Sequence, residues 1–217
     1  MPIRYSYERA DHVVFQSEFN KKLTESWFGK HPFSTVVHNA ADESLIKNTT
    51  TDFIDNKFDK ETEIWSCASS WRPHKRLSEN LRYFCDQSPE NAIMLVAGKN
   101  ADLSTIKNFS RVSGNRIYYL GDLNYKDLIS LYKRSTTFVH LSYLDHCPNV
   151  VVDAQAAGCH IVCSSTGGTK EIVSKGTIIL EDEWDFSPTK LYEPPNIDFS
   201  NYLLKNTEND LKSLSDV

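Results

Sequence analysis

The chain has 217 residues, enough for one α/β domain or two very small ones, and it is long enough to bury a substantial core. Hydrophobic residues make up 40% and charged residues 24%, which is typical of a soluble globular protein. The formal net charge of −5 argues against a nucleic-acid partner, because phosphate binding needs clustered cations. No apolar run approaches the ~18 residues of a membrane-spanning helix, and the N-terminal segment lacks the apolar core of a signal peptide. We therefore expect a cytoplasmic protein that does not span a membrane.

The first predicted unit is short: a strand over 12–15, a helix over 17–28 capped by Ser17, and a strand over 35–38. Residues 48–61 are polar and rich in Thr and Asp, which is typical of a connector.

Strands then alternate with helices. Leu77, Leu81, Phe84 and Cys85 follow one another at helical spacing and predict a helix over 75–87. The other elements expected are strands over 64–68, 92–97, 116–120, 136–141, 160–164 and 177–180, and helices over 127–134, 150–157 and 169–173. After Glu181 the chain is polar, with three prolines, and a weak helix is expected over 206–214.

The fold class follows from this alternation. Short strands without polar alternation, separated by helices, indicate a parallel sheet that is covered on both faces. With right-handed crossovers, such a sheet is a doubly wound, Rossmann-like α/β fold. Five cysteines, an odd number without a CxxC pair, predict neither a disulfide framework nor a zinc knuckle, and Cys159 and Cys163 are expected to be buried thiols.

Ligands of such a sheet bind at the carboxyl ends of the strands, at the point where the strand order reverses. This rule nominates the loops 69–75, 98–101, 121–123, 142–149 and 165–169.

The residues in these loops suit a phosphorylated ligand that is rich in hydroxyl groups. Arg72, His74 and Lys75 are cations that can bind phosphate. Asp145 and Asp153 are carboxylates that can bind vicinal hydroxyls, and the N-terminus of helix 150–157 offers free N–H groups to an anion. A nicotinamide dinucleotide is disfavoured because residues 65–70 read WSCASS and lack G-x-G-x-x-G.

The segment 141–173, LSYLDHCPNVVVDAQAAGCHIVCSSTGGTKEIV, resembles the C-terminal, nucleotide-sugar-binding half of family 4 retaining glycosyltransferases, which have the two-domain GT-B fold. In that family an acid is followed by seven residues, a second acid at the start of EAxAxGxPVV, and a GGxxE loop; Asp145, Asp153, Gly167 and Glu171 match this order. ADHVVFQSEFNKKL, VVHNAAD, the basic loop 71–76 and IYYLGDL resemble further blocks of the family in the same order. The resemblance covers residues 10–175.

The resemblance implies a division into a remnant of the acceptor-side domain at 1–42, a connector at 43–62, a nucleotide-sugar-binding domain at 63–185 and a tail at 186–217. It implies hexosyl transfer from a nucleotide-diphosphate sugar, UDP- or GDP-linked, with no cofactor and no metal, since no DxD signature is present. The catalytic candidates are Lys75 and Arg72 at the diphosphate and Asp145 at the hexose. The donor-binding candidates are Asn39, Gly98, Gly121, Asp122, Leu123, Cys147, Pro148, Asn149, Val150 and Asp153.

The chain departs from the family pattern in several places. Both acids are aspartates where the family has glutamates, which shortens each side chain by about 1.5 Å. The phosphate-binding arginine of the family would fall at Ser70, so Arg72 is the nearby substitute, and Ala40 replaces a glycine. Front-face displacement in the family disfavours a catalytic role for His74 or His146.

A complete enzyme of this family also has an acceptor-binding domain ahead of the donor-binding one. The chain is therefore expected to be a fragment, to work with an acceptor-binding partner chain, or to have lost catalysis. The alternatives to an active enzyme are a non-catalytic nucleotide-sugar-binding module and a subunit of a split glycosyltransferase. A sugar-nucleotide epimerase of the same fold would need the missing domain as well.

Overall fold

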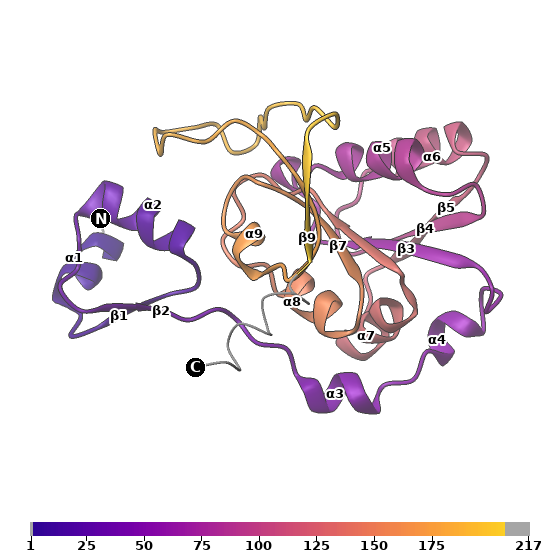
Figure 1. The fold of residues 1–217 in the computed structure, drawn as a ribbon, viewed down its shortest axis with the longest axis horizontal. Coiled ribbons are helices and arrows are strands. Elements are labelled where there is room, and N and C mark those ends of the chain that lie inside the picture. The colour runs from indigo at the N-terminus through magenta and orange to yellow at the C-terminus, as the bar shows by residue number, and fades with distance from the viewer. Residues whose placement is uncertain (1, 207–217) are drawn as a thin grey trace.

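The protein was analysed as a computed structural model, which describes residues 2–206. A large α/β unit contains a seven-stranded sheet, and a small N-terminal unit lies beside it (Figure 1).

The large sheet has the strand order β5-β4-β3-β6-β7-β8-β9. Its strands are β3 (Glu63–Ala68), β4 (Ala92–Ala97), β5 (Ile117–Gly121), β6 (Thr137–His140), β7 (His160–Ser164), β8 (Lys175–Ile179) and β9 (Tyr202–Asn206). The first six are parallel, which confirms the predicted doubly wound sheet. The order reverses between β3 and β6, so the loops that follow these two strands meet at the switch point.

The edge strand β9 was not predicted. It pairs antiparallel with β8, from Tyr202 opposite Ile179 to Asn206 opposite Lys175. Its pairing with an existing edge, and not a local pattern, makes the segment a strand. Asn206, where the weak helix was predicted to start, is the last residue of β9; the rest of that helix, 207–214, lies outside the described residues.

Helices cover both faces of this sheet. On one face lie α5 (Leu77–Gln87) and α6 (Leu103–Val112), and on the other lie α7 (Tyr125–Arg134) and α8 (Asn149–Ala156) (Figure 1). Successive residues of β3 pack on opposite faces of the sheet: Trp65 lies in the core under α5, and Ile64 lies in the core under α7. The short elements η1 (Pro73–Lys75) and α9 (Thr169–Ile172) complete this unit.

The helix α6 was not predicted, although its sequence carries a start signal. Asp102 caps it by accepting hydrogen bonds from Ser104 N and Oγ and from Thr105 Oγ1. Ile106 and Phe109 pack toward the core at a spacing of three residues.

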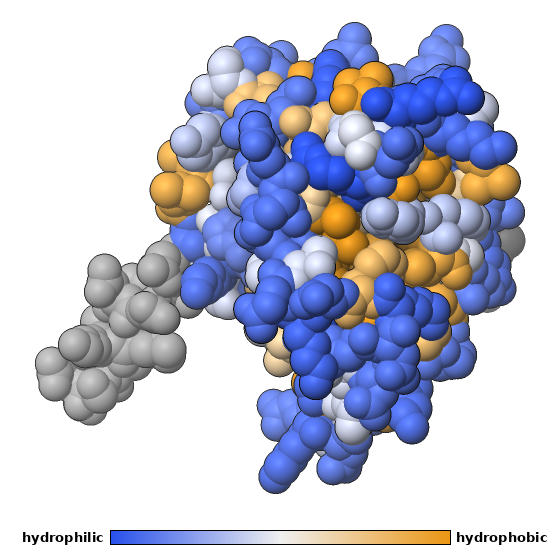
Figure 2. Space-filling model, turned by 90° about the vertical axis from the view of Figure 1, so that its right-hand side faces the viewer, coloured by the Kyte–Doolittle hydropathy of each residue, from blue (hydrophilic) through white to orange (hydrophobic). Residues whose placement is uncertain are grey.

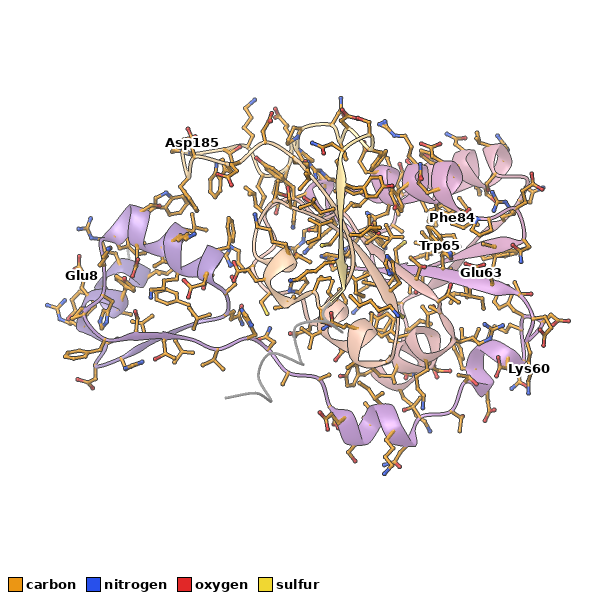
Figure 3. The ribbon with its side chains drawn as sticks, in the orientation of Figure 1. Glu8, Lys60, Glu63, Trp65, Phe84 and Asp185 are labelled. Carbon is orange, nitrogen blue, oxygen red and sulfur yellow. The ribbon has the colours of Figure 1, made fainter. Side chains whose placement is uncertain are left out.

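The aromatic packing under α5 shows how the core is filled. Trp65 and Phe84 meet edge to face with ring centroids 5.8 Å apart (Figure 3), and Trp65 Nε1 donates to Glu63 Oε1 at 2.9 Å. Cys159 and Cys163 are buried, as predicted, and burial raises the pKa of both thiols to about 12.

The outer end of the molecule, where β5 is the edge strand, has a mostly hydrophilic surface with hydrophobic residues gathered across its middle (Figure 2). Within β5 itself, Tyr118 and Tyr119 are exposed.

The small N-terminal unit contains α1 (Pro2–Arg9), β1 (Val13–Phe15), α2 (Glu18–Phe28) and β2 (Ser34–Val36), with β1 and β2 paired in parallel. Ser17 Oγ accepts from Asn20 N at 3.0 Å and caps α2, as predicted. The helix α1 was not predicted. The connection to the large unit contains α3 (Glu43–Asn48) and α4 (Asp52–Asp55).

Residues 48–61, which are predicted to be a connector, contain α4 and are hydrogen-bonded to the large unit. Arg134 Nε donates to Asp55 Oδ1 at 3.0 Å, and its Nη2 reaches the carbonyl oxygens of Asp59, Lys60 and Thr62. One guanidinium therefore anchors the segment.

Replacement of this anchor should destabilise the fold. We expect Arg134→Ala to lower the free energy of unfolding by about 1.5–3 kcal/mol, because charge-assisted hydrogen bonds are lost together. Urea denaturation measures the effect, with Lys107→Ala, an exposed residue of α6, as the control. Equal stabilities of the two variants would contradict the anchoring role.

Candidate functional site

An ion pair occupies the switch point of the sheet. Lys75, the last residue of η1, places Nζ 2.5 Å from Asp145 Oδ2 in the loop after β6. His140, at the end of β6, donates from Nε2 to the same oxygen at 3.0 Å. The His140 ring is 5% exposed and stacks on Phe138 at an interplanar angle of 14°. Two side chains, one from η1 and one from β6, therefore hold one carboxylate oxygen.

The surroundings keep Asp145 charged. Burial by itself would raise its pKa, but the hydrogen bond and charge of His140 and the ammonium of Lys75 outweigh burial and lower the pKa below its usual range. The second carboxylate oxygen, Oδ1, accepts from His146 N at 3.1 Å. Every oxygen of this carboxylate thus already has a partner.

The glycine pair after β7 packs directly on this loop. Gly168 N donates to Asp145 O at 2.7 Å, and a Cβ on Gly167, which has φ +78°, would come within 2.4 Å of the same carbonyl oxygen. Only glycine permits this approach at Gly167. The pair therefore supports the Asp145 main chain.

Asp153 lies in a different part of the site. It is on α8, is 6% exposed and accepts from Tyr125 Oη at 3.1 Å. Burial raises the pKa of this carboxyl group, and the hydrogen bond from Tyr125 opposes the rise. The structure brings Asp153 together with Asn39, Asn149 and Val150 around a groove of about 580 Å³, which Tyr125 also lines.

A second groove of about 390 Å³ continues from the first, because Val150 and Leu128 line both. It lies at the carboxyl ends of β3 and β4 and is lined by Gly98, Asp122 and Leu123. Gly98 has φ +108°, and a Cβ there would come within 1.9 Å of Ser69 O, so the residue has to be glycine. We call the two grooves together the donor cleft, after the nucleotide-sugar donor that the sequence resemblance predicts for these residues.

The remaining predicted residues lie around this cleft in different ways. Asn39 Nδ2 donates to Asn149 Oδ1 at 2.6 Å and to Cys147 O at 3.1 Å. Cys147 is buried, Pro148 is the residue before α8, and Gly121 closes β5 with φ +77°.

Arg72, in contrast, does not line either groove of the donor cleft, although its carbonyl oxygen accepts from Lys75 N at 2.8 Å. It lines a separate groove between the first turns of α5 and α6. The role predicted for Arg72 at the diphosphate stays a prediction.

The two loop histidines are held by the protein. His146 is hydrogen-bonded through Nδ1 to Asn20 Nδ2 at 3.2 Å and packs on Phe19, whereas His74 is buried. Burial lowers the pKa of both imidazoles.

Several residues of the site were not found by sequence reasoning. Tyr125 and His140 are two of them, and the signal for His140 was a lone histidine at the end of a buried strand, next to a nominated loop.

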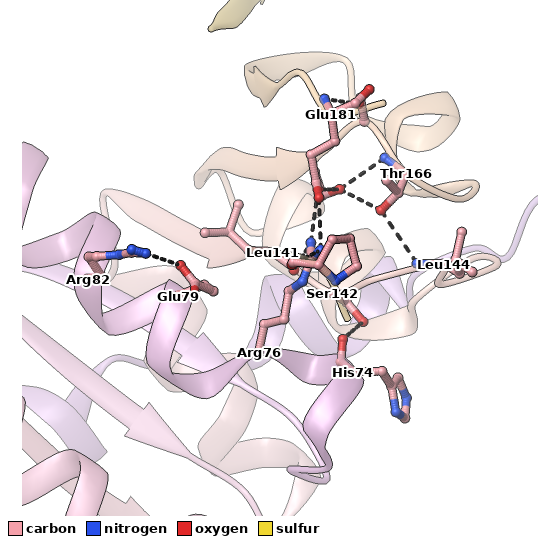
Figure 4. A network of polar contacts seen from close by, with 12 residues as sticks. His74, Arg76, Glu79, Arg82, Leu141, Ser142, Leu144, Thr166 and Glu181 are labelled. Carbon is pink, nitrogen blue, oxygen red and sulfur yellow. Dashed lines mark hydrogen bonds and ion pairs between the residues drawn. The ribbon is translucent and has the colours of Figure 1, made fainter. Parts of the chain in front are cut away.

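The ion pair of Arg76 and Glu181 was also not found by sequence reasoning. Arg76 Nη1 and Nη2 donate to Glu181 Oε1 and Oε2 at 2.9 and 2.8 Å, and Ser164 Oγ also donates to Glu181 (Figure 4). These partners are 105 residues apart, so no local pattern connects them.

Polar contacts also join the two units. Glu171 of the GGxxE loop accepts from Glu18 N at 2.6 Å and from Phe19 N at 2.7 Å, so its carboxylate lies at the N-terminus of α2. Trp27 Nε1 donates to Phe186 O at 3.2 Å.

Within residues 2–206, no group of three or more His, Cys, Asp or Glu side chains is close enough to hold a metal ion. The helices of this part of the chain are all too short or too polar to cross a membrane.

The charge state of Asp145 gives a test by pH. Because its folded pKa is below the unfolded value of about 3.9, its stabilising contribution is fully present above that value and is lost as the pH falls through the folded pKa. We therefore expect Asp145→Asn to be less stable than the natural protein at neutral pH, by an amount that shrinks below pH ~4.

Urea unfolding from pH 2 to 7 measures this difference, with the exposed Asp86→Asn as the matched control. In a His140→Leu background, Asp145→Asn should lower the free energy of unfolding by a smaller amount, because one of the interactions that favour the carboxylate is already gone. A pH-independent difference, or an unchanged cost in that background, would contradict this account of the site.

Comparison with known proteins assigns the chain to a family. Residues 48–186 match the model of the family described as Glycosyl transferases group 1. No curated protein sequence matches the chain.

Solved structures share the fold. Sucrose-phosphate synthase from Thermosynechococcus elongatus has a TM-score of 0.68 at 16% identity, over 82% of this chain and 47% of that one. HepE from Anabaena in complex with UDP-glucose has a TM-score of 0.69 at 18% identity, over 82% and 52%. WaaG, a glycosyltransferase involved in lipopolysaccharide biosynthesis, has a TM-score of 0.66 at 16% identity, over 88% and 54%.

The chain thus spans about half the length of these proteins. The fold matches that of GT-B glycosyltransferases, and the family match covers more than half of the chain. The chain belongs to the group 1 glycosyltransferases.

Proposed function

We propose that this chain is the donor-binding part of a retaining glycosyltransferase and binds a nucleotide-diphosphate sugar, UDP- or GDP-linked. The observation that carries the proposal is the charged Lys75–Asp145 pair at the switch point, in the same fold as a donor cleft that ends at Asp153. The similarity in fold to HepE in complex with UDP-glucose supports a nucleotide sugar as the ligand class.

In the proposed complex the base lies by residues 121–123 and the ribose lies by Asp153. Tyr125 holds one carboxylate oxygen of Asp153, which leaves the other oxygen for a ribose hydroxyl. Asn39 and Asn149, already hydrogen-bonded to each other, line the same groove.

The diphosphate is held by positive charge that the protein already supplies. The helix α8 begins after Pro148 without a side-chain cap, so the N–H groups of Asn149 and Val150 are free for an anion. Lys75 shares its ammonium between Asp145 and the leaving diphosphate. Because these groups are in place before bond cleavage, they stabilise the charge that builds on the leaving group, and the proposal needs no metal ion.

Asp145 is proposed to bind hydroxyls of the hexose. Its carboxylate is ionised and fixed by Lys75 and His140, so a sugar hydroxyl would add a further donor to an acceptor that is already oriented. His140 is a positioning residue in this scheme, since it acts through Asp145.

Residues 1–42 are proposed to be a remnant of the acceptor-side domain. The sheet of this unit has only the two three-residue strands β1 and β2, and Val14 and Phe33 are both 63% exposed. So small a sheet needs further packing to be stable. This observation favours the second candidate function, a donor-binding subunit that acquires activity with an acceptor-binding partner chain.

Ligand binding tests the proposal directly. UDP-, GDP- and ADP-sugars are compared in a thermal-shift series with EDTA present, and we expect a rise in Tm for one of them. Binding that EDTA abolishes and magnesium restores would overturn the metal-free scheme. Sugar transfer or hydrolysis by the chain alone would favour the enzyme over the donor-binding subunit.

Lys75 tests the diphosphate contact. We expect Lys75→Ala to reduce the binding free energy of UDP by about 1.5–3 kcal/mol, because a charged hydrogen bond to phosphate is lost. The binding of uridine should be nearly unchanged. Isothermal titration of both ligands to the same variant separates this effect from any loss of stability, and Lys107→Ala is the control. Equal losses for UDP and uridine would show that Lys75 is structural.

The two aspartates should have separate effects. Asp153→Asn is expected to reduce the binding free energy of UDP itself by about 1–2 kcal/mol, because the hydrogen bond to the ribose becomes weaker. Asp145→Asn should leave the affinity for UDP nearly unchanged and remove the preference for the UDP-sugar over UDP. Titration of both ligands, with Asp86→Asn as the control, checks this division, and identical profiles for the two variants would refute it.

A further inference from the structure

The hydroxyl of Tyr125 lies beside the buried acid of the donor cleft. Tyr125 is the first residue of α7, and its Oη donates to Asp153 Oδ1 on α8 at 3.1 Å. The two helices lie next to each other on one face of the large sheet (Figure 1), and both residues line the groove of about 580 Å³. One side chain from each helix therefore meets at this groove.

Helical spacing places these side chains in the groove wall. On α7, Tyr125 and Leu128 are three residues apart and both line the groove. On α8, Asn149 and Asp153 are four residues apart and both line it as well. Because such spacings put side chains on one face of a helix, α7 and α8 each present one face to the groove.

The two side chains are exposed to different degrees. Asp153 is 6% exposed, whereas Tyr125 is 46% exposed. The hydroxyl that bonds to the recessed carboxylate thus belongs to a side chain that solvent reaches. A ligand group bound to this carboxylate would also lie beside the tyrosine hydroxyl.

The hydrogen-bonding capacity of the pair suits a vicinal diol. Burial and the charge of Asp153 raise the pKa of Tyr125, so the phenol keeps its proton at neutral pH. Since that proton is donated to Oδ1, the phenol oxygen is left as an acceptor. No described residue donates to the other carboxylate oxygen, Oδ2. The pair therefore offers two acceptors to a ligand, and a vicinal diol has two donors.

The charge of the groove favours neutral donors over phosphate. Among the described residues that line the groove, Asp153 is the only charged one. Asp42, which caps α3, adds a further negative charge nearby that opposes the ionisation of Asp153. A phosphate would be repelled by these carboxylates, whereas hydroxyl groups can donate to them.

We propose that Tyr125 is a ribose-binding residue of the donor cleft. Its oxygen accepts from one ribose hydroxyl, and Asp153 Oδ2 accepts from the other. The tyrosine thereby adds an acceptor beside an acid that is one methylene shorter than the glutamate of the family pattern. The inference rests on the proposed function, because it takes a nucleotide sugar as the ligand. The diol is that of the ribose because this groove continues into the one proposed to hold the base, to which the ribose is bonded.

Titration calorimetry with UDP, 2′-deoxy-UDP and 3′-deoxy-UDP tests the assignment, or the GDP series if GDP is the nucleotide that binds. The natural protein should bind each analogue about two- to tenfold more weakly than UDP, because each analogue leaves one acceptor of the pair without a donor. Tyr125→Phe removes only the hydroxyl. This variant should no longer discriminate against one of the two analogues and should still discriminate against the other.

Each discrimination is a ratio of affinities within one variant, so a loss of stability does not change it. Tyr202→Phe, which removes the hydroxyl of an exposed tyrosine on β9, is the matched control and should keep both ratios.

Three results would overturn the proposal while the proposed function stands. If Tyr125→Phe weakens all three ligands by the same factor, or none of them, the tyrosine does not bind the ribose. If the variant loses both discriminations, Tyr125 acts only by positioning Asp153. If the natural protein binds UDP and both analogues equally well, the ribose assignment of this groove is wrong. Absence of binding of any nucleoside diphosphate would overturn the proposed function together with this inference.

Discussion

The buried pair of Arg76 and Glu181 connects the carboxyl ends of the central strands of the large sheet. Arg76 follows the loop after β3 and also donates to Leu141 O after β6 and to Pro195 O in the C-terminal tail. Glu181 follows β8 and accepts from Ser164 at the end of β7. The ends of four neighbouring strands thus meet in one network. Because removal of either partner would leave a buried charge without compensation, the loops around the switch point depend on this pair.

The candidate site depends on this network through chain connectivity. Lys75 directly precedes Arg76, so the ammonium that pairs with Asp145 extends from a backbone that the Arg76–Glu181 pair fixes. Tyr143 N donates to His74 O at 2.8 Å and ties the β3 and β6 loops a second time. A carboxylate that accepts hydrogen bonds from Lys75, His140 and His146 N needs such rigid loops, since small displacements would separate the charges.

Local patterns predicted most of the large unit, because each buried strand is a continuous apolar run and the helices show one apolar face. The helix α6 was not predicted because Ile106 is its one buried residue, which leaves a weak apolar pattern. The strand β9 was not predicted because its pairing with β8, and not its own sequence, makes it a strand. The motif order nominated Lys75, Asp145 and Asp153. It could not show that Lys75 and Asp145 neutralise each other, or that Arg72 faces a separate groove, because both depend on side-chain directions.

The contact of Glu171 with α2 connects the small unit to the chemistry of the large one. Glu171 lies three residues after Gly168, whose N–H bonds to the Asp145 carbonyl, and the same glycine leaves no room for a side chain beside Ser17. Consecutive contacts thus connect α2, Glu171, the glycine pair and the main chain of Asp145. A rotation of α2 would therefore reach the Asp145 main chain as a displacement of its carbonyl oxygen. The angle between the two units and the position of the Asp145 main chain are then coupled.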